Sequence, residues 1–73
     1  MNIEKAKQKI EKYLQEECSD YWHVKLQGDE IMAYFIDTLR FVITYDDGDW
    51  NISGTDIDIS MVYNIAIVLE TNL

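Results

Sequence analysis

Three carboxylates surround a single glycine in the stretch Asp46-Asp47-Gly48-Asp49, which lies between two runs of alternating apolar and polar residues. Carboxylates gathered around a turn can hold a hard cation such as calcium, or they can present negative charge to a basic partner. At such a turn they can also simply keep the surface soluble, because Asp-Gly is a favoured turn sequence and hairpin tips are exposed.

The calcium interpretation rests on oxygen-bearing side chains that recur at the spacing of an EF-hand loop, namely Asp47, Asp49, Asn51, Ser53, Thr55 and Asp58. The match fails where the geometry is strictest. Ile52 stands where the loop needs a glycine for its sharp turn, and Asp58 stands where a bidentate glutamate is needed. The segment also alternates like a strand, so we predict no metal site.

A nucleophilic active site would have to be built around His23, the only histidine in the chain. The only cysteine, Cys18, lies five positions earlier, and no third group that could orient a base is evident. The ordinary interpretations are a strand histidine and a half-buried thiol. We therefore predict that the protein is not an enzyme and carries no cofactor.

The charge is strongly negative and unevenly distributed. Fourteen acidic residues against six basic ones give a net charge of −8, and no Lys or Arg follows Arg40. Four Lys and two Glu leave residues 1–12 with a charge of +2, so residues 13–73 carry −10. Direct binding to nucleic acid or to an anionic membrane is disfavoured, because both need cationic residues. A basic protein partner is favoured instead.

Seventy-three residues of which 48% are hydrophobic predict one folded domain spanning residues 1–73. No apolar run reaches the length of a membrane span, and the N-terminus has no apolar signal segment. A single cysteine excludes an internal disulfide and suits a reducing compartment. We therefore expect a cytoplasmic protein.

Residues 2–18 are predicted to form a helix, with Asn2 as the N-cap. Apolar residues recur there at spacings of three and four and form one stripe: Ile3, Ala6, Ile10, Tyr13 and Leu14. Lysines in the first half and glutamates at the end run against the helix dipole. The helix must therefore be stabilised mainly by packing its stripe on another element.

Four strands are predicted at Tyr21–Gln27, Ile31–Ile36, Leu39–Tyr45 and Trp50–Ser53. Asp47-Gly48 is the strongest hairpin signal, since this pair readily adopts the positive φ angles of a type I′ turn. The turns are too short for crossover helices, so the sheet is expected to be an antiparallel meander.

Two strands carry further expectations. Both faces of Ile31–Ile36 are apolar, which predicts a central strand or one covered on both sides. Leu39–Tyr45 alternates, which predicts one shared face for Leu39, Phe41, Ile43 and Tyr45.

The last segment fits two patterns. Apolar residues alternate from Ile57 to Leu69 as in a strand, yet thirteen residues are long for a strand and several apolar positions also fit a helix. We predict a helix that starts near Asp56 or Asp58. Such a helix is apolar around most of its surface, which indicates deep burial or a self-association face and hence a possible homodimer.

The order of elements and several local strings resemble a family of small phage-encoded anti-CRISPR proteins that inhibit Cas9 by mimicking PAM-containing DNA. The matching strings cover about a quarter of the chain: Met1-Asn2-Ile3, Asp20-Tyr21 with Val24-Lys25-Leu26-Gln27-Gly28, and Asp47-Gly48-Asp49-Trp50-Asn51-Ile52-Ser53. The chain departs from the family in having only Glu70 as an acidic residue near its end, and in one-residue spacing differences before Val24 and within the hairpin.

The resemblance implies that carboxylates on the hairpin and at the start of the sheet stand in for DNA phosphates and base edges and occupy the arginines that would read the PAM. By position, it assigns this role to Asp47, Gly48 and Asp49, and also to Asp20. Together with the acidic cluster itself, the predicted partner-binding residues are Asp46, Asp47, Gly48, Asp49, Trp50 and Asp20. The expected fold is α+β, with an N-terminal helix, a four-stranded antiparallel meander and a C-terminal helix. The expected function is inhibition of a Cas9-type nuclease through its basic groove, and the alternative is a structural protein that self-associates through its last helix.

Overall fold

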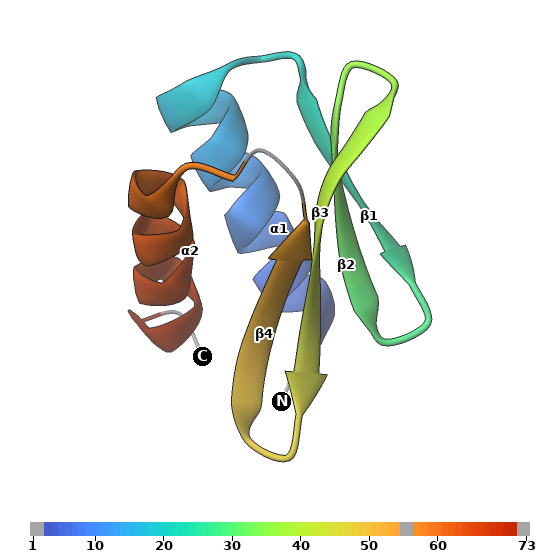
Figure 1. Ribbon diagram of the computed structural model, residues 1–73, viewed down its shortest axis with the longest axis vertical. Helices are drawn as coiled ribbons and strands as arrows, with labels where there is room; N and C mark the ends of the chain where they lie inside the picture. The colour runs from blue at the N-terminus through green and yellow to red at the C-terminus, as the bar shows by residue number, and fades with distance from the viewer. Residues whose placement is uncertain (1–2, 55–56, 72–73) are drawn as a thin grey trace.

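The computed structural model describes residues 3–54 and 57–71, and it has the predicted α+β architecture. Helix α1 and a π-helical turn precede four strands, and helix α2 follows them: α1 (Ile3–Tyr13), the π turn (Leu14–Cys18), β1 (Trp22–Gln27), β2 (Glu30–Phe35), β3 (Thr38–Asp46), β4 (Asp49–Gly54) and α2 (Ile59–Thr71). Both helices lie on the same side of the sheet, so the molecule has two layers (Figure 1).

The sheet is the predicted antiparallel meander, with strands in the order β1-β2-β3-β4. Asp47 and Gly48 have φ angles of 50° and 90°. Positive values at both central residues define the type I′ turn, whose twist matches that of the flanking strands. The hairpin prediction is therefore confirmed.

The core lies between the helices and the sheet and contains no buried polar side chain among the described residues. Each strand turns alternate residues toward the helices, as the period of two requires. The buried side chains are Ala6, Ile10 and Leu14 from the first helical segment, Trp22, Val24, Ile31, Ala33, Phe41 and Ile43 from the sheet, and Ile65 and Leu69 from α2.

The first helix uses its predicted apolar stripe for this packing. Its last turn widens, because the Ser19 N–H donates to the Leu14 carbonyl over 2.9 Å, five residues back. The sequence predicted one regular helix over residues 2–18, and the π turn was not foreseen. Asn2, the predicted N-cap, lies outside the described residues.

Side chains of the first helix also reach the outer edge of β1. The Val24 N–H donates to Glu11 Oε2 over 3.2 Å, and Gln15 Nε2 donates to the Trp22 carbonyl over 3.0 Å. Glu11 and Gln15 are four positions apart, so they lie above one another on the same side of the helix. The two side chains thus pair the Val24 N–H and the Trp22 carbonyl, backbone groups that would otherwise be unpaired at the outer edge of the sheet.

A bulge in the β2–β3 ladder places one residue, Leu39, on a different face of the sheet from the one predicted. Ala33 lies opposite Phe41, but Tyr34 lies opposite Leu39, so Arg40 is an extra residue without a cross-strand partner. Residues after the bulge follow the predicted alternation. Leu39, before it, shares a face with Tyr34 and not with Phe41, and the prediction that it joins the core face is wrong.

The other face of the sheet is not covered by any described element (Figure 1). Its centre is half-buried by its own side chains, because His23 stacks on Tyr34 with 5.7 Å between ring centroids and Lys25 Nζ lies 5.4 Å from the same ring. For β2, the expectation of a central strand is confirmed, whereas cover on both faces is not found among the described residues. Apolar residues such as Met32 are therefore half-buried on this face.

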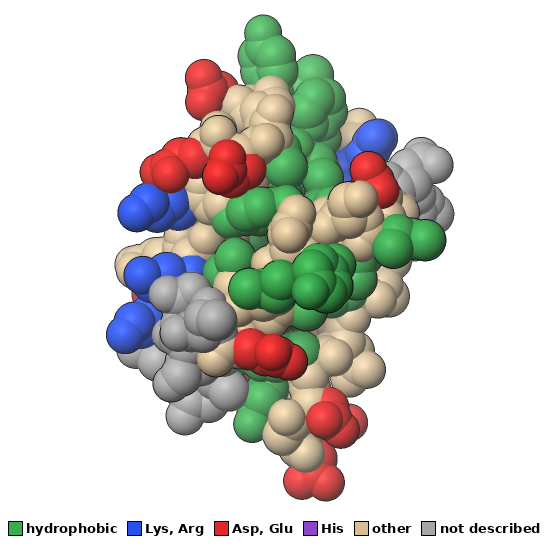
Figure 2. All heavy atoms as spheres, turned by 90° about the vertical axis from the view of Figure 1, so that its left-hand side faces the viewer, with side chains coloured by type: hydrophobic (Ala, Val, Ile, Leu, Met, Phe, Trp, Pro, Cys, Tyr) green, Lys and Arg blue, Asp and Glu red, His purple; other side chains and the backbone are tan. Residues whose placement is uncertain are grey.

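The C-terminal segment is the predicted helix. Asp58 caps it, since the Ser60 N–H donates to Asp58 Oδ1 over 3.0 Å, while Asp56 lies outside the described residues. Ile65 and Leu69 are buried against the core. On the other side of α2 an exposed apolar stripe remains, formed by Ile59, Tyr63 and Ile67. Figure 2 shows apolar side chains on the face of the molecule that α2 forms.

Candidate functional site

The β3–β4 hairpin carries the predicted carboxylates at one end of the molecule. Asp46 and Asp49 lie directly opposite each other, and Asp47 and Gly48 form the turn between them. All four residues are exposed. Figure 2 shows acidic side chains at the lower end of the molecule, where Figure 1 places this hairpin.

An aromatic pair positions the hairpin. Tyr45 and Trp50 are opposite each other, and their rings meet edge to face with 4.9 Å between centroids. Aromatic cross-strand pairs of this kind stabilise antiparallel ladders. Because side chains alternate, the pair lies on the helix side and Asp46 and Asp49 lie on the open side of the sheet. Trp50 is half-buried, so it supports the site more than it extends from it.

Two further carboxylates join the hairpin, and sequence reasoning missed them. Asp29 lies in the β1–β2 turn and Glu30 begins β2. In a meander the first and third turns lie at the same end, which is the lower end in Figure 1. Glu30 is opposite Thr44, one strand away from the hairpin carboxylates. The signal was present in the predicted topology, which placed both turns together.

We call the resulting set the acidic end: Asp29, Glu30, Asp46, Asp47 and Asp49. All five residues are exposed. Within residues 3–54 and 57–71 the salt bridge found joins Lys7 to Glu11 on α1, and no carboxylate of the acidic end forms an ion pair or a side-chain hydrogen bond. Its charge is therefore directed to solvent.

Asp20 does not belong to this group. It is exposed just before β1, at the end of the sheet where the Ile36 N–H donates to the Tyr21 carbonyl over 3.0 Å. The β3–β4 hairpin is at the opposite end of a molecule whose longest dimension is 30 Å. The structure thus brings five of the six predicted partner-binding residues together and separates Asp20 from them.

No three His, Cys, Asp or Glu side chains of the described chain converge to hold a metal ion. The EF-hand-like segment is not a loop, because Asp49–Gly54 is strand β4 and Asp58 is used to cap α2. Thr55, at the ninth position of that pattern, lies outside the described residues. His23 is held in the ring stack with Tyr34.

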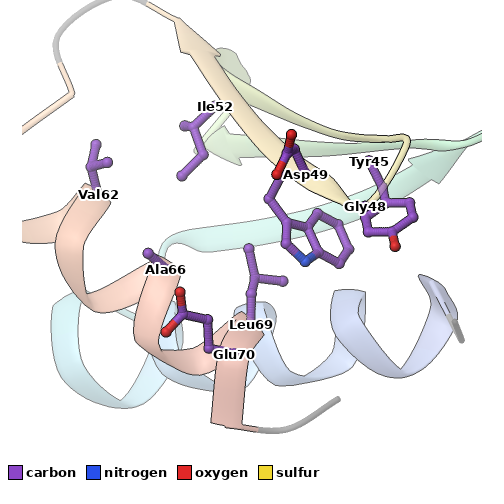
Figure 3. A pocket seen from close by; sticks show the side chains of 9 residues that line it. Tyr45, Gly48, Asp49, Ile52, Val62, Ala66, Leu69 and Glu70 are labelled. Atoms are coloured by element: carbon purple, nitrogen blue, oxygen red, sulfur yellow. The ribbon is translucent and has the colours of Figure 1, made fainter.

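A groove of about 560 Å³ lies between β4 and α2, beside the acidic end. Figure 3 shows side chains from the strand and from the helix facing one another across it. Its walls are mainly apolar, and acidic side chains stand at its rim: Tyr45, Trp50, Ile52, Val62, Ala66 and Leu69 form the walls, with Gly48, Asp49 and Glu70 completing the lining. No local sequence signal predicted it, because its two walls come from separate elements.

Neither helix within residues 3–54 and 57–71 has the length and apolar character needed to cross a lipid bilayer. In comparisons with known proteins, no family model, no curated protein and no solved structure matches this chain.

Proposed function

We propose that this protein is a non-enzymatic acidic binding protein that inhibits a nucleic-acid-binding protein by occupying its basic groove. A Cas9-type nuclease is the specific target we propose, and the protein would act in the cytoplasm of a cell that carries a phage or mobile element. The observation that carries the proposal is the acidic end, where two turns present carboxylates that no described side chain neutralises.

The physical argument concerns spacing and rigidity. Neighbouring strands are about 4.8 Å apart, so carboxylates on adjacent strands form an array of negative charges on a scale comparable to successive phosphates. The aromatic pair Tyr45–Trp50 and the type I′ turn hold the hairpin in one conformation. A rigid acidic surface can bind arginine and lysine side chains arranged for phosphates without first becoming ordered.

The direct test is size-exclusion chromatography of the purified protein with guide-loaded Cas9 proteins from several unrelated systems. We expect co-elution that fades as salt is raised, because exposed charges are screened. Prior addition of a PAM-containing duplex should abolish co-elution, and a duplex without a PAM should not. Failure to bind any of the nucleases, or binding that the PAM duplex leaves unchanged, would contradict DNA mimicry of this target.

A second candidate function is self-association through α2. The stripe formed by Ile59, Tyr63 and Ile67 repeats every fourth residue, and these side chains are 84%, 67% and 40% exposed. Three large apolar side chains on one face of a helix are typical of an interaction surface. In this alternative the protein is a structural or accessory homodimer, and the acidic end serves solubility.

Analytical ultracentrifugation tests this alternative. A dimer that forms as concentration rises and is lost in Ile67→Lys would support it, because the introduced lysine would have to be desolvated in the interface. Gln8→Lys, at an exposed position of α1, is the matched control and should leave the dimer intact. A monomer at all concentrations would exclude this function.

A further inference from the structure

Strand β4 is an outer strand of the sheet, and its free edge borders the groove. In a two-residue hairpin, the residues that flank the turn form the first hydrogen-bonded pair, here Asp46 and Asp49. Bonding then alternates along the ladder, so the backbone N–H and C=O groups of Trp50, Ile52 and Gly54 face away from β3. No hydrogen bond found within residues 3–54 and 57–71 uses these outward groups.

The side chains of Trp50 and Ile52 point toward the helix layer, where the groove lies. Trp50 and Ile52 line it on the strand side, and Val62, Ala66 and Leu69 line it on the α2 side (Figure 3). An added strand would therefore meet two features at once: a row of unpaired backbone groups, and an apolar space for every second side chain. This combination is the basis of recognition by strand addition.

The chemistry on the other face of the added strand is set by charge. Asp46 and Asp49 lie on the open side of the sheet. Residues 41–73 contain no Lys or Arg that could neutralise them. Side chains of an added strand that face the open side would thus be favoured if they were cationic.

We propose that β4 accepts an antiparallel strand from a protein partner in which apolar and cationic residues alternate. The apolar residues occupy the groove between β4 and α2, and the cationic residues lie beside Asp46 and Asp49 on the open face. Pairing is antiparallel, as in the rest of the sheet, so the apolar residues of the partner strand are the ones whose N–H groups donate to Trp50 and Ile52.

A second copy of this chain is a poor occupant. Each copy carries a charge of −8 and has no cation after Arg40, so β4 of one copy offers nothing to the carboxylates of another. Charged side chains at an edge strand are a known protection against such self-pairing. The same charges that exclude a second copy select a cationic strand.

The test uses a six-residue peptide, matching the length of β4, with the sequence Arg-Val-Arg-Leu-Arg-Val and blocked ends. Binding to the full chain is followed by isothermal titration and by backbone amide NMR. We expect the largest shifts, and new protection from exchange, at the amides of Trp50, Ile52 and Gly54. A peptide with Asp in place of Arg should not bind. This test contains no nuclease, so its result is independent of the target proposed above.

N-methylated peptides separate strand addition from simple charge attraction. Methyl groups on the backbone nitrogens of the apolar residues should weaken binding by about tenfold or more, because N-methylation removes the N–H groups that donate to β4. Methyl groups on the backbone nitrogens of the arginine residues should be tolerated, because those backbone N–H groups face away from β4 and into solvent. Equal binding of both methylated peptides, or loss only with the methylated arginines, would overturn the proposal.

A pair of protein variants tests the groove. Ala66→Leu fills the groove from a helix position that favours leucine, and it should abolish peptide binding. Ser60→Leu adds the same side chain to an exposed position of α2 outside the groove lining, and it should bind like the parent. If Ala66→Leu is folded by its amide spectrum and still binds the peptide, the groove is not the binding site.

Discussion

Each of the two outer strands of the sheet has one row of backbone groups that no neighbouring strand pairs, and the surroundings of these two rows differ. At β1, helix side chains complete the edge, because Glu11 accepts from the Val24 N–H and Gln15 donates to the Trp22 carbonyl. At β4 no described side chain does so, and the strand begins beside a cluster of carboxylates. An edge that is covered can bind nothing further, whereas an edge that is charged repels copies of itself and remains open to a partner of opposite charge.

This comparison also divides the molecule into a part that stabilises the fold and a part that is available for binding. In the helix stripe beneath β1, Ile10 and Leu14 are both 0% exposed. Between β4 and α2, Trp50, Ile52 and Val62 are half-buried and border a groove. Substitutions on the two sides should therefore differ in their effect on the free energy of unfolding.

The largest difference in the free energy of unfolding is expected when one side chain is truncated on the β1 side and one on the β4 side. Leu14→Ala should lower the free energy of unfolding by about 2–5 kcal/mol, because it leaves a cavity in the core. This loss is a large part of the total free energy of unfolding, which is roughly 4–11 kcal/mol for a chain of 73 residues. Val62→Ala, in the groove wall, should cost about 1 kcal/mol or less. Urea denaturation measures both, and equal losses would contradict the division.

The covered edge itself can be broken by Glu11→Ala. This variant leaves the Val24 N–H without its acceptor, and an unsatisfied amide at a part-buried site costs about 1–3 kcal/mol. In native-state hydrogen exchange the Val24 amide of the parent should be protected and the Ile52 amide should exchange fast, whereas in Glu11→Ala both should exchange fast. Glu16→Ala removes an exposed carboxylate nearby and serves as control. Fast exchange at Val24 in the parent would show that the edge is not covered in solution.

The smallest effect concerns the charged edge. Asp46 and Asp49 are like charges directly opposite each other, an arrangement that is mildly destabilising. Asp49→Asn should raise the melting temperature slightly at low salt, and the gain should vanish at high salt. The same variant should self-associate more readily, as seen by light scattering, because the edge has lost part of its charge. Lower stability at low salt would mean that Asp49 has a favourable partner.

Much of the fold follows from short-range patterns. Alternation placed the four strands, Asp47-Gly48 set the hairpin turn, and Asp58 started the last helix, each within a few residues of the structure. These features depend on backbone preferences that neighbouring residues decide. The errors occur where the pairing between segments decides the outcome, as at the bulge in the β2–β3 ladder that places Leu39 on the open face.

The candidate site was predicted only in part, for the same reason. The hairpin carboxylates are consecutive, so the sequence showed them together. The meander brings Asp29 and Glu30 to the same end of the sheet as the hairpin carboxylates, and it places Asp20 at the opposite end. The groove depends on how far α2 lies from β4, a distance set by the packing of α2 against α1 and the core. Periodicity cannot encode such a distance.

The most direct test of the central claim compares the two ends of the sheet in binding to a guide-loaded Cas9. The variant Asp47→Asn/Asp49→Asn removes two charges from the acidic end, and Asn is chosen because it tolerates the positive φ at position 47. The variant Glu17→Gln/Asp20→Asn removes the same charge from exposed positions before β1.

We expect the hairpin variant to bind a nuclease that co-elutes with the parent about 10–100-fold more weakly, and the control variant to bind within about twofold of the parent. Equal loss in both variants would show that net charge alone drives binding, and no loss in the hairpin variant would contradict the assignment of the acidic end.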